Sequence, residues 1–315
     1  MSPLVSGALL ALASAIAFGA TAPLIGRFGA HLGPWSIAAL LYLGAALAIR
    51  PTIAPASRER PIARRELPRI MLTGVLGAML APAALAWGIA HTGALSASLV
   101  LALESAFTVA VAVAFFHEAV GRRVVIAMVL ISGGAALLVA ANGGAGFGGL
   151  GVLAVTVATL LWAIDNAITG TITGADPSAI VVLKSTTGIV GSIACALLAR
   201  EPLPSAYNGV ALIVIGAVGY GASLRWYLLA QRRFGVARTA SLFAIAPFIG
   251  AAIAYALGER AAAGPVFALA AVLIAAGVAL HITERHEHPH RHGALVHSHA
   301  HAHAHEGGHQ DHDHP

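Results

Sequence analysis

Four ionisable residues lie inside long apolar stretches of the sequence: Glu104, Asp165, Lys184 and Arg225. Asp165 sits in the run TLLWAIDNAIT (159–169), directly before Asn166. A charged group at membrane depth is costly, so such residues face a protein interior or a water-filled cavity and pair with one another. Intramembrane carboxylates also line substrate pathways and relay protons. The sequence therefore directs attention to these positions before any others.

The depth of these residues predicts which of them meet. Asp165, Lys184 and Arg225 each lie a few residues from the same side of the membrane, so we expect Asp165 to pair with Lys184 or Arg225. Glu104 lies nearer the midplane, ten residues into its apolar stretch. Two interpretations stay open. The first is a structural ion pair with Lys184 and Arg225 extending toward the headgroups. The second is a proton relay, or a cation that holds a substrate carboxylate.

The composition explains why charge is so rare in these stretches. Hydrophobic residues make up 58% of the 315 positions and charged residues only 10%, whereas soluble domains carry about 25% charged residues. A single cysteine, Cys195, excludes a disulfide framework. A membrane-spanning helix needs about 20 apolar residues, and continuous apolar runs without strict alternation favour helices over a barrel. The chain is predicted to be an all-α polytopic membrane protein.

Hydropathy predicts ten transmembrane helices, and the first is expected to be a span and not a cleaved signal peptide, because MSP precedes it without a basic residue. The segments are 4–26, 34–50, 68–90, 94–116, 121–141, 149–170, 177–199, 206–230, 236–257 and 264–282.

Basic residues between these segments set the expected orientation. One side of the membrane receives thirteen arginines and the other side three. The thirteen are Arg50, Arg58, Arg60, Arg64, Arg65, Arg69, Arg122, Arg123, Arg232, Arg233, Arg238, Arg285 and Arg291. The positive-inside rule then places both termini in the cytoplasm. It also accounts for the net charge of +5 without a nucleic-acid partner.

The sequence has an internal repeat. Residues 101–123 and 242–260 have similar patterns, with Gly93 aligned to Gly235 and Glu118 to Glu259. The two copies are predicted to be domains of five helices, residues 4–141 and 149–282. Because five is odd, the second copy is inverted, as in many transporters whose site lies between repeats. Glu118 and Glu259 are expected to cap helix ends or bind nearby arginines.

These residues resemble the EamA family of the drug/metabolite transporter superfamily. In that family the fourth helix of each repeat opens near L-E-P and closes near G-E-R. This chain has Leu103-Glu104-Ser105 and His117-Glu118-Ala119 in the first copy, and Ala246-Pro247 and Gly258-Glu259-Arg260 in the second. The resemblance implies secondary transport with spans one, three, four, six, eight and nine around a central cavity. Trp162 and Trp226 would then line a substrate pocket, and anchoring at the membrane interface or ordinary packing stays open as the other interpretation.

The last 33 residues, 283–315, have a different character and are predicted to be a disordered, cytoplasmic tail. Imidazole suits Zn, Ni, Co and Cu, and such a tract needs no packed core. The sequence therefore predicts weak Zn, Ni or Co binding here. The histidines are His286, His288, His290, His292, His297, His299, His301, His303, His305, His309, His312 and His314.

Together these features predict a multi-pass secondary transporter of the inner membrane. It would export a small metabolite or amino acid by alternating access, with proton coupling through the buried carboxylates. Two other classes stay open: a divalent-metal transporter with a metal-collecting tail, and a membrane sensor or scaffold that transports nothing. No catalytic triad or nucleotide loop is present in the sequence, so an enzyme is not expected and no cofactor is required. The expected partners are a small-molecule substrate, the lipid bilayer and divalent metal ions, with a homodimer left open.

Overall fold

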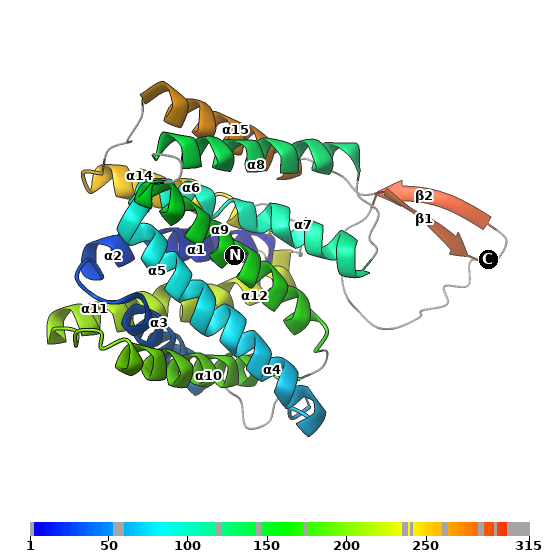
Figure 1. Cartoon of the computed structure of the whole chain (residues 1–315). Coiled ribbons are helices and arrows are strands. Elements are labelled where there is room, and N and C mark those ends of the chain that lie inside the picture. The colour runs from blue at the N-terminus through cyan, green and yellow to red at the C-terminus, as the bar shows by residue number, and fades with distance from the viewer. Residues whose placement is uncertain are drawn as a thin grey trace.

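The fold is helical, with one short strand pair near the C-terminus (Figure 1). The structure, a computed structural model, describes residues 3–52, 60–116, 121–142, 146–172, 175–234, 239, 242–259, 264–282, 287–292 and 295–300. The α-helices are α1 (Pro3–Gly19), α2 (Thr21–Phe28), α3 (Pro34–Ile49), α4 (Leu67–Thr73), α5 (Ala81–Thr92), α6 (Ala94–Val100), α7 (Leu103–Phe116), α8 (Arg122–Ala141), α9 (Phe147–Gly170), α10 (Pro177–Leu198), α11 (Ala206–Gly216), α12 (Ser223–Phe234), α14 (Ala246–Ala256) and α15 (Gly264–Ile282). Between them lie the short 3₁₀ turns η1 (Arg50–Thr52) and η2 (Arg64–Glu66) and the π-helical segments η3 (Gly74–Leu80) and η4 (Ala217–Ala222).

Within the described residues, seven helical segments are long and apolar enough to cross a membrane. They are Val5–Phe28, Arg64–Thr92, Ala94–Phe115, Arg122–Ala141, Gly148–Gly170, Ser178–Leu198 and Ala206–Tyr227. Three shorter apolar helices are Pro34–Ile49, Ala246–Ala256 and Gly264–Leu280. Each coincides with one of the predicted segments. The chain is therefore a multi-pass helical membrane protein.

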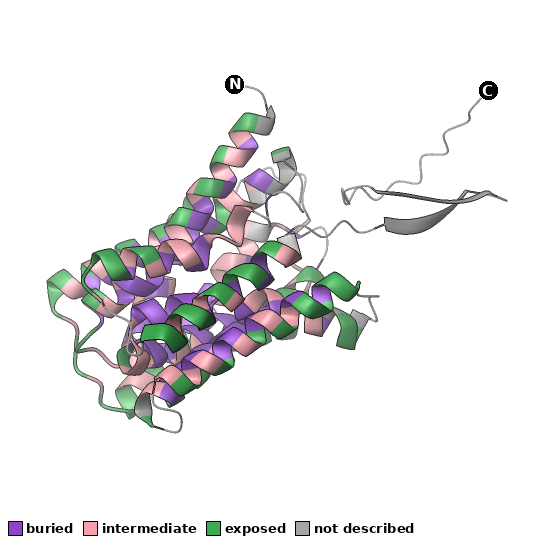
Figure 2. Cartoon of the chain, turned by 90° about the horizontal axis from the view of Figure 1, so that it is seen from above, coloured by how far each residue is buried: buried purple, intermediate pink, exposed green. Residues whose placement is uncertain are grey.

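Helices that are distant in the sequence pack side by side. α8 lies against α15 at one edge of the molecule and α3 against α10 at the other (Figure 1). Between them, α5 packs on α9, and α1 packs on α12 and α14. The buried core between these helices is rich in alanine, and the exposed residues follow the outer faces (Figure 2). Small residues let helix backbones approach closely where lipid provides no hydrophobic driving force.

Three predicted spans are interrupted where continuous helices were expected. The span predicted over 4–26 breaks at Ala20, because Pro23 has no N–H to donate to the carbonyl of Gly19. The span predicted over 94–116 breaks at residues 101–102. There the N–H groups of Ala102 and Glu104 bond three residues back, to Leu99 and Leu101. Such i→i+3 bonds tighten the turn and interrupt the α-helical ladder.

The third interruption lies in the span predicted over 236–257. Residues 244–245 form a turn, and α14 begins at Ala246 with Pro247 in its first turn. Proline is favoured at that position because its missing N–H is not needed there. Residues 236–238, 240 and 241 lie outside the described residues. This turn and the turn at 101–102 are separated by 143 positions in the sequence.

The two π-helical segments show the same spacing. η3 begins at Gly74 and η4 at Ala217, again 143 positions apart. At their ends, the N–H of Ala81 bonds to the carbonyl of Leu76, and the N–H of Ser223 bonds to the carbonyl of Val218. These bonds span five residues instead of four, so one main-chain carbonyl in each segment loses the N–H that it would accept in an α-helix. Such π-helical segments occur often at functional sites.

Glutamates from loops cap helices in a distant part of the chain. Glu259 accepts the N–H of Leu95 at 2.9 Å, in the first turn of α6. Glu201 accepts the N–H groups of Trp35 and Ser36 at the start of α3, at 3.2 and 2.8 Å. Carboxylates are favoured at helix N-termini, where N–H groups lack partners. The capping role predicted for Glu259 is confirmed, whereas Glu118 lies outside the described residues.

The described part of the tail forms two short strands, and the disorder predicted for residues 283–315 stays a prediction. Strand β1 (Glu287–His292) pairs antiparallel with β2 (Leu295–Ala300), so that His290 lies opposite His297 and His288 opposite His299. Gly293 and Ala294, between the two strands in the sequence, lie outside the described residues. Residues 283–286 and 301–315 lie outside the described residues.

Candidate functional site

A buried ion pair joins α9 to α10. The ammonium of Lys184 donates to both carboxylate oxygens of Asp165, at 2.5 and 2.7 Å. Thr169, one turn after Asp165, donates its hydroxyl to the same carboxylate at 3.1 Å. The Asp165 side chain is 5% exposed and that of Lys184 14% exposed. The ion pair expected for Asp165 is therefore confirmed, with Lys184 as the partner.

Local sequence explains how α9 and α10 bring these two side chains together. α9 ends at Gly170, and α10 begins at Pro177 after Asp176, whose carboxylate caps the helix by accepting the N–H of Ser178 at 2.8 Å. Aspartate at the N-cap followed by proline is a strong helix start. The short connection makes the two helices antiparallel neighbours, and Asp165 and Lys184 then lie at the same depth.

The segment η3 packs against the ion pair on a third side, and the residue in contact with it is a glycine. A side chain on Gly77 would overlap the Asp165 carboxylate, so only glycine leaves room for it. Gly74 and Gly188 provide the same closeness between η3 and α10, because a Cβ on either would meet backbone of the other segment. The ion pair is thus enclosed by η3, α9 and α10.

The carbonyl of Gly77 has no main-chain donor and is bonded by side chains instead. In an α-helix it would accept the N–H of Ala81, but that group bonds to Leu76. The next residue, Pro82, has no N–H. The carbonyl accepts the Tyr42 hydroxyl at 2.6 Å and the Trp162 indole N–H at 2.9 Å. Because a buried carbonyl without a partner is costly, these two donors fix η3 against α3 and α9.

An aromatic cluster extends from this carbonyl toward η4. The rings of Tyr42 and Tyr220 are 5.5 Å apart, those of Phe18 and Tyr220 5.9 Å, and those of Phe18 and Trp162 6.3 Å. Phe243 completes the cluster at 5.4 Å from Phe18. Among the described residues, the buried hydroxyl of Tyr220 has no hydrogen-bond partner. An aromatic-walled region with one free donor therefore lies beside the charged site.

A second polar contact lies on the neighbouring side of α9. The side-chain amide of Asn166 donates to Glu104 at 3.3 Å. Glu104 lies in the first turn of α7, directly after the break at residues 101–102, where the helix dipole favours a negative charge. Asp165 and Asn166 are consecutive, so α9 contacts α10 through one residue and α7 through the next. The predicted residues Glu104, Asp165, Asn166 and Lys184 therefore lie together, and Trp162 lies one turn away.

The other predicted residues lie elsewhere. Arg225 is exposed on α12, so the sequence alternative in which it partners Asp165 is not the arrangement observed. Trp226 lines a separate crevice between α1 and the segment α11–η4–α12. Of the tail histidines, His288, His290, His292, His297 and His299 lie on β1 and β2, and the others lie outside the described residues.

Sequence reasoning missed three contributors to the site. Thr169 is four residues after Asp165, a spacing that places both on one helix face. That spacing could have identified it. Gly77 gives no such signal, because glycine is common in membrane helices. Tyr42 was missed because its partner is a main-chain carbonyl, which a π-helical segment frees and which no residue pattern marks.

The fold and this site define the class: a multi-pass helical membrane protein with ionisable side chains paired inside the membrane. Residues 5–140 match the model of the EamA-like transporter family. Over these residues the chain is therefore similar to the EamA-like transporter family, which is part of the drug/metabolite transporter superfamily. The family resemblance expected from the sequence is confirmed over residues 5–140, and it implies a transporter-like function of the drug/metabolite transporter type.

Comparison with solved structures adds information on the fold. A chain described only as "Crystal structure of protein" aligns with a TM-score of 0.62 and 18% sequence identity. The alignment covers 88% of this chain and 95% of that chain. At this identity the likeness shows the fold alone, and it extends well beyond the 5–140 region. No curated protein matches the chain.

Proposed function

We propose that the protein is a secondary active transporter of the inner membrane, which exports a small metabolite or amino acid by proton-coupled alternating access. The observation that carries the proposal is the Asp165–Lys184 pair, enclosed by η3, α9 and α10. Burying two charges costs desolvation energy that packed apolar residues would avoid. A chain that keeps such a pair at membrane depth uses it for more than packing.

The proton step follows from the partners of the carboxylate. Lys184, bonded to both oxygens of Asp165, favours the ionised form of the carboxylate. A movement that separates α9 from α10 removes the ammonium, and the unpaired carboxylate then binds a proton at Oδ1 or Oδ2. When the helices close again, Lys184 displaces that proton. Glu104 and Asn166, on the neighbouring side of α9, supply the next polar contact along the path.

The finer architecture of the proposal is ten transmembrane helices as two inverted five-helix repeats, with both termini in the cytoplasm. The shared spacing of the two π-helical segments and of the two helix breaks supports it. So does the packing, in which α5 on α9 corresponds to α12 on α1. The apolar helices Pro34–Ile49, Ala246–Ala256 and Gly264–Leu280 are shorter than most transmembrane helices. In the proposed architecture, neighbouring residues extend each of them to the full width of the bilayer.

The transport test uses proteoliposomes loaded with a panel of amino acids and screened with and without a proton gradient. We expect gradient-dependent flux of at least one compound by the wild type. Asp165→Asn should retain residual flux that no longer responds to the gradient. Ser14→Ala is the control, because it alters a buried polar contact between α1 and α12 without touching the ion pair, and its flux should remain gradient-dependent.

Two results would overturn the proposal. Gradient-dependent flux that is unchanged in Asp165→Asn would remove the carboxylate from the coupling mechanism. Absence of flux for every compound tested, with protein of unchanged thermal stability, would favour the sensor or scaffold alternative.

The tail supports a second function, a divalent-metal transporter whose tail collects Zn, Ni or Co. The supporting observation is twelve histidines in the last thirty residues. Within the described residues, no three His, Cys, Asp or Glu side chains gather around a common point. The test compares metal tolerance of cells that carry the full-length chain and a chain ending at residue 282. A growth difference between the two cell lines that appears only when metal is added would favour this function. Equal growth of the two in added metal would exclude it.

A further inference from the structure

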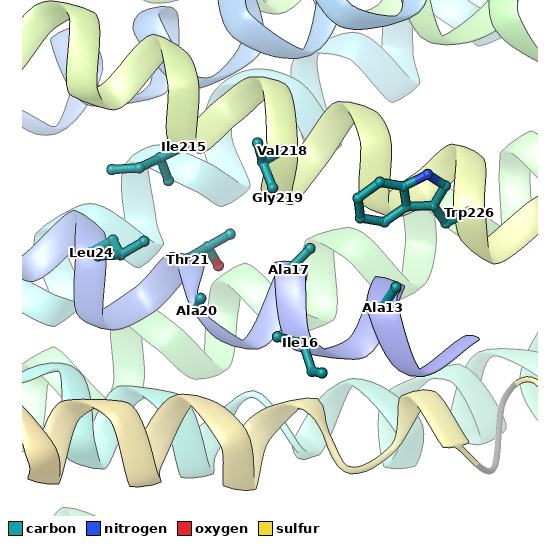
Figure 3. A pocket seen from close by; sticks show the side chains of 10 residues that line it. All are labelled: Ala13, Ile16, Ala17, Ala20, Thr21, Leu24, Ile215, Val218, Gly219 and Trp226. Atoms are coloured by element: carbon teal, nitrogen blue, oxygen red, sulfur yellow. The ribbon is translucent and has the colours of Figure 1, made fainter. Parts of the chain in front are cut away.

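A crevice of about 450 Å³ lies between α1 and the segment α11–η4–α12 (Figure 3). Its lining is almost entirely apolar. Ala13, Ala17 and Ala20 leave space on one side because their side chains are small, and Ile215, Val218 and Trp226 form the other side. Figure 3 shows the Trp226 ring at one end of the crevice, above Ala13.

The crevice opens on the outer face of the helices. On its rim, Ile16 is 46% exposed and Val218 is 43% exposed. Ile16 continues a row of exposed side chains at helical spacing, Val5, Leu9 and Leu12. The opposite face of α1 carries the buried residues Ala11 and Ser14. In a membrane protein, an exposed apolar face contacts lipid, so the crevice opens toward acyl chains.

A charged residue precedes one of the residues that line the crevice. Arg225 precedes Trp226 on α12 and is exposed. Among the described residues, no acidic side chain forms an ion pair with it. An arginine near the end of a span extends its guanidinium to the headgroup layer, where it binds phosphate through paired N–H donors. Tryptophan beside it is typical of the same layer.

We propose that the crevice between α1 and α11–η4–α12 holds an anionic phospholipid, with an acyl chain between the helices and the phosphate on Arg225. The apolar lining of the crevice suits an acyl chain, and the positive guanidinium is complementary to the negative phosphate of the headgroup. In the orientation proposed above, the lipid belongs to the cytoplasmic leaflet, where anionic lipids attract basic residues. This role assigns Arg225 to the lipid boundary and leaves Lys184 as the cation of the internal site.

The first experiment measures headgroup selectivity on the full-length protein. Delipidated protein in detergent is titrated with phosphatidylglycerol or phosphatidylcholine, and bound lipid is counted by native mass spectrometry. We expect one tightly retained phosphatidylglycerol in the wild type. Arg225→Gln should bind it about fivefold more weakly, the effect of one basic residue at an anionic surface. Arg233→Gln, which removes an exposed arginine further along α12, is the matched control and should bind as the wild type does.

The second experiment tests the acyl chain with phosphatidylglycerol brominated in the chain, which quenches nearby tryptophan fluorescence. The quenching of Trp226 is obtained by subtracting the fluorescence quenching of Trp226→Phe from that of the wild type. Filling the crevice with Ala13→Phe, or more mildly with Ala13→Val, should reduce this quenching in the order of side-chain size. The proposal is overturned if Arg225→Gln and Arg233→Gln bind phosphatidylglycerol equally, or if Trp226 is not quenched in the wild type.

Discussion

Two helix crossings in this protein use a π-helical segment in the same way but bring different side chains into contact. Where η3 packs on α9, Gly77 lies against the carboxylate of Asp165. Where η4 packs on α1 and the start of α2, Gly219 lies against the side chain of Thr21, the first residue of α2. Beyond it, Ser14 and Ser223 exchange hydrogen bonds of 2.8 to 3.0 Å. The second crossing shows that neutral hydroxyls are enough to hold such helices together. The charges at the first crossing therefore need a reason other than packing.

The largest expected effect comes from separating the two charges of the first crossing. Lys184→Met should lower the free energy of unfolding by about 3–5 kcal/mol, because it leaves a buried carboxylate without its partner. The double variant Asp165→Asn with Lys184→Met removes both charges and should recover most of that loss. Thermal and denaturant unfolding in detergent measure both. Losses that simply add in the double variant would mean that the two side chains are not coupled.

The glycines of the two crossings should differ in tolerance. Gly77→Ala should cost about 1–3 kcal/mol through overpacking, because the new methyl group meets a carboxylate held by Lys184 and Thr169. Gly219→Ala should cost less, because it meets the methyl group of Thr21. Gly133→Ala is the control, since nothing lies within 4 Å of the added group. The same unfolding measurements apply, and equal losses at 77 and 219 would contradict the comparison.

The donors to the Gly77 carbonyl should show a cooperative effect. Trp162→Phe removes one hydrogen bond and should cost about 1 kcal/mol. Tyr42→Phe should cost a similar amount, since either donor alone still satisfies the carbonyl. The double variant leaves the carbonyl bare and should cost more than the two single changes together. A double-mutant cycle measures this, and strict additivity would show that the carbonyl finds another donor.

The smallest effect is expected at the serine pair of the second crossing. Ser14→Ala should cost about 0.6 kcal/mol, the average for such contacts between membrane helices. Unlike Asp165→Asn, it should leave any proton dependence of transport unchanged. Flux in proteoliposomes at two external pH values measures that dependence. A change of pH dependence in Ser14→Ala would remove the distinction between a functional and a packing crossing.

Much of this fold follows from the sequence, because long apolar runs specify membrane helices without reference to their neighbours. The Asp165–Lys184 pair was also predictable, since a short connection between two spans fixes the relative depth of their side chains. The choice of Lys184 over Arg225 was not. It depends on the rotation of α10 and α12 about their axes, which is set by close packing at positions such as Gly188.

The interruptions of the helices were harder to predict. Pro23 and Pro247 mark two of them, and proline gives a local signal. The break at residues 101–102 has no proline and arises in an apolar run. The π-helical segments have no pattern of their own in the sequence. For the same reason Glu201 was missed as a cap, because its partners at Trp35 and Ser36 are far away in the chain.

The acceptor that joins Tyr42 and Trp162 belongs to the main chain, and this limits how the protein can change in evolution. Substitution can remove a donor at position 42 or 162, but no substitution at position 77 can delete the carbonyl itself. Variation at this point of the fold is confined to the donors and to Pro82, whose missing N–H keeps the carbonyl free. Homologues that gain an N–H at position 82 should therefore tolerate loss of the tyrosine or the tryptophan, and homologues that keep the proline should retain at least one of them.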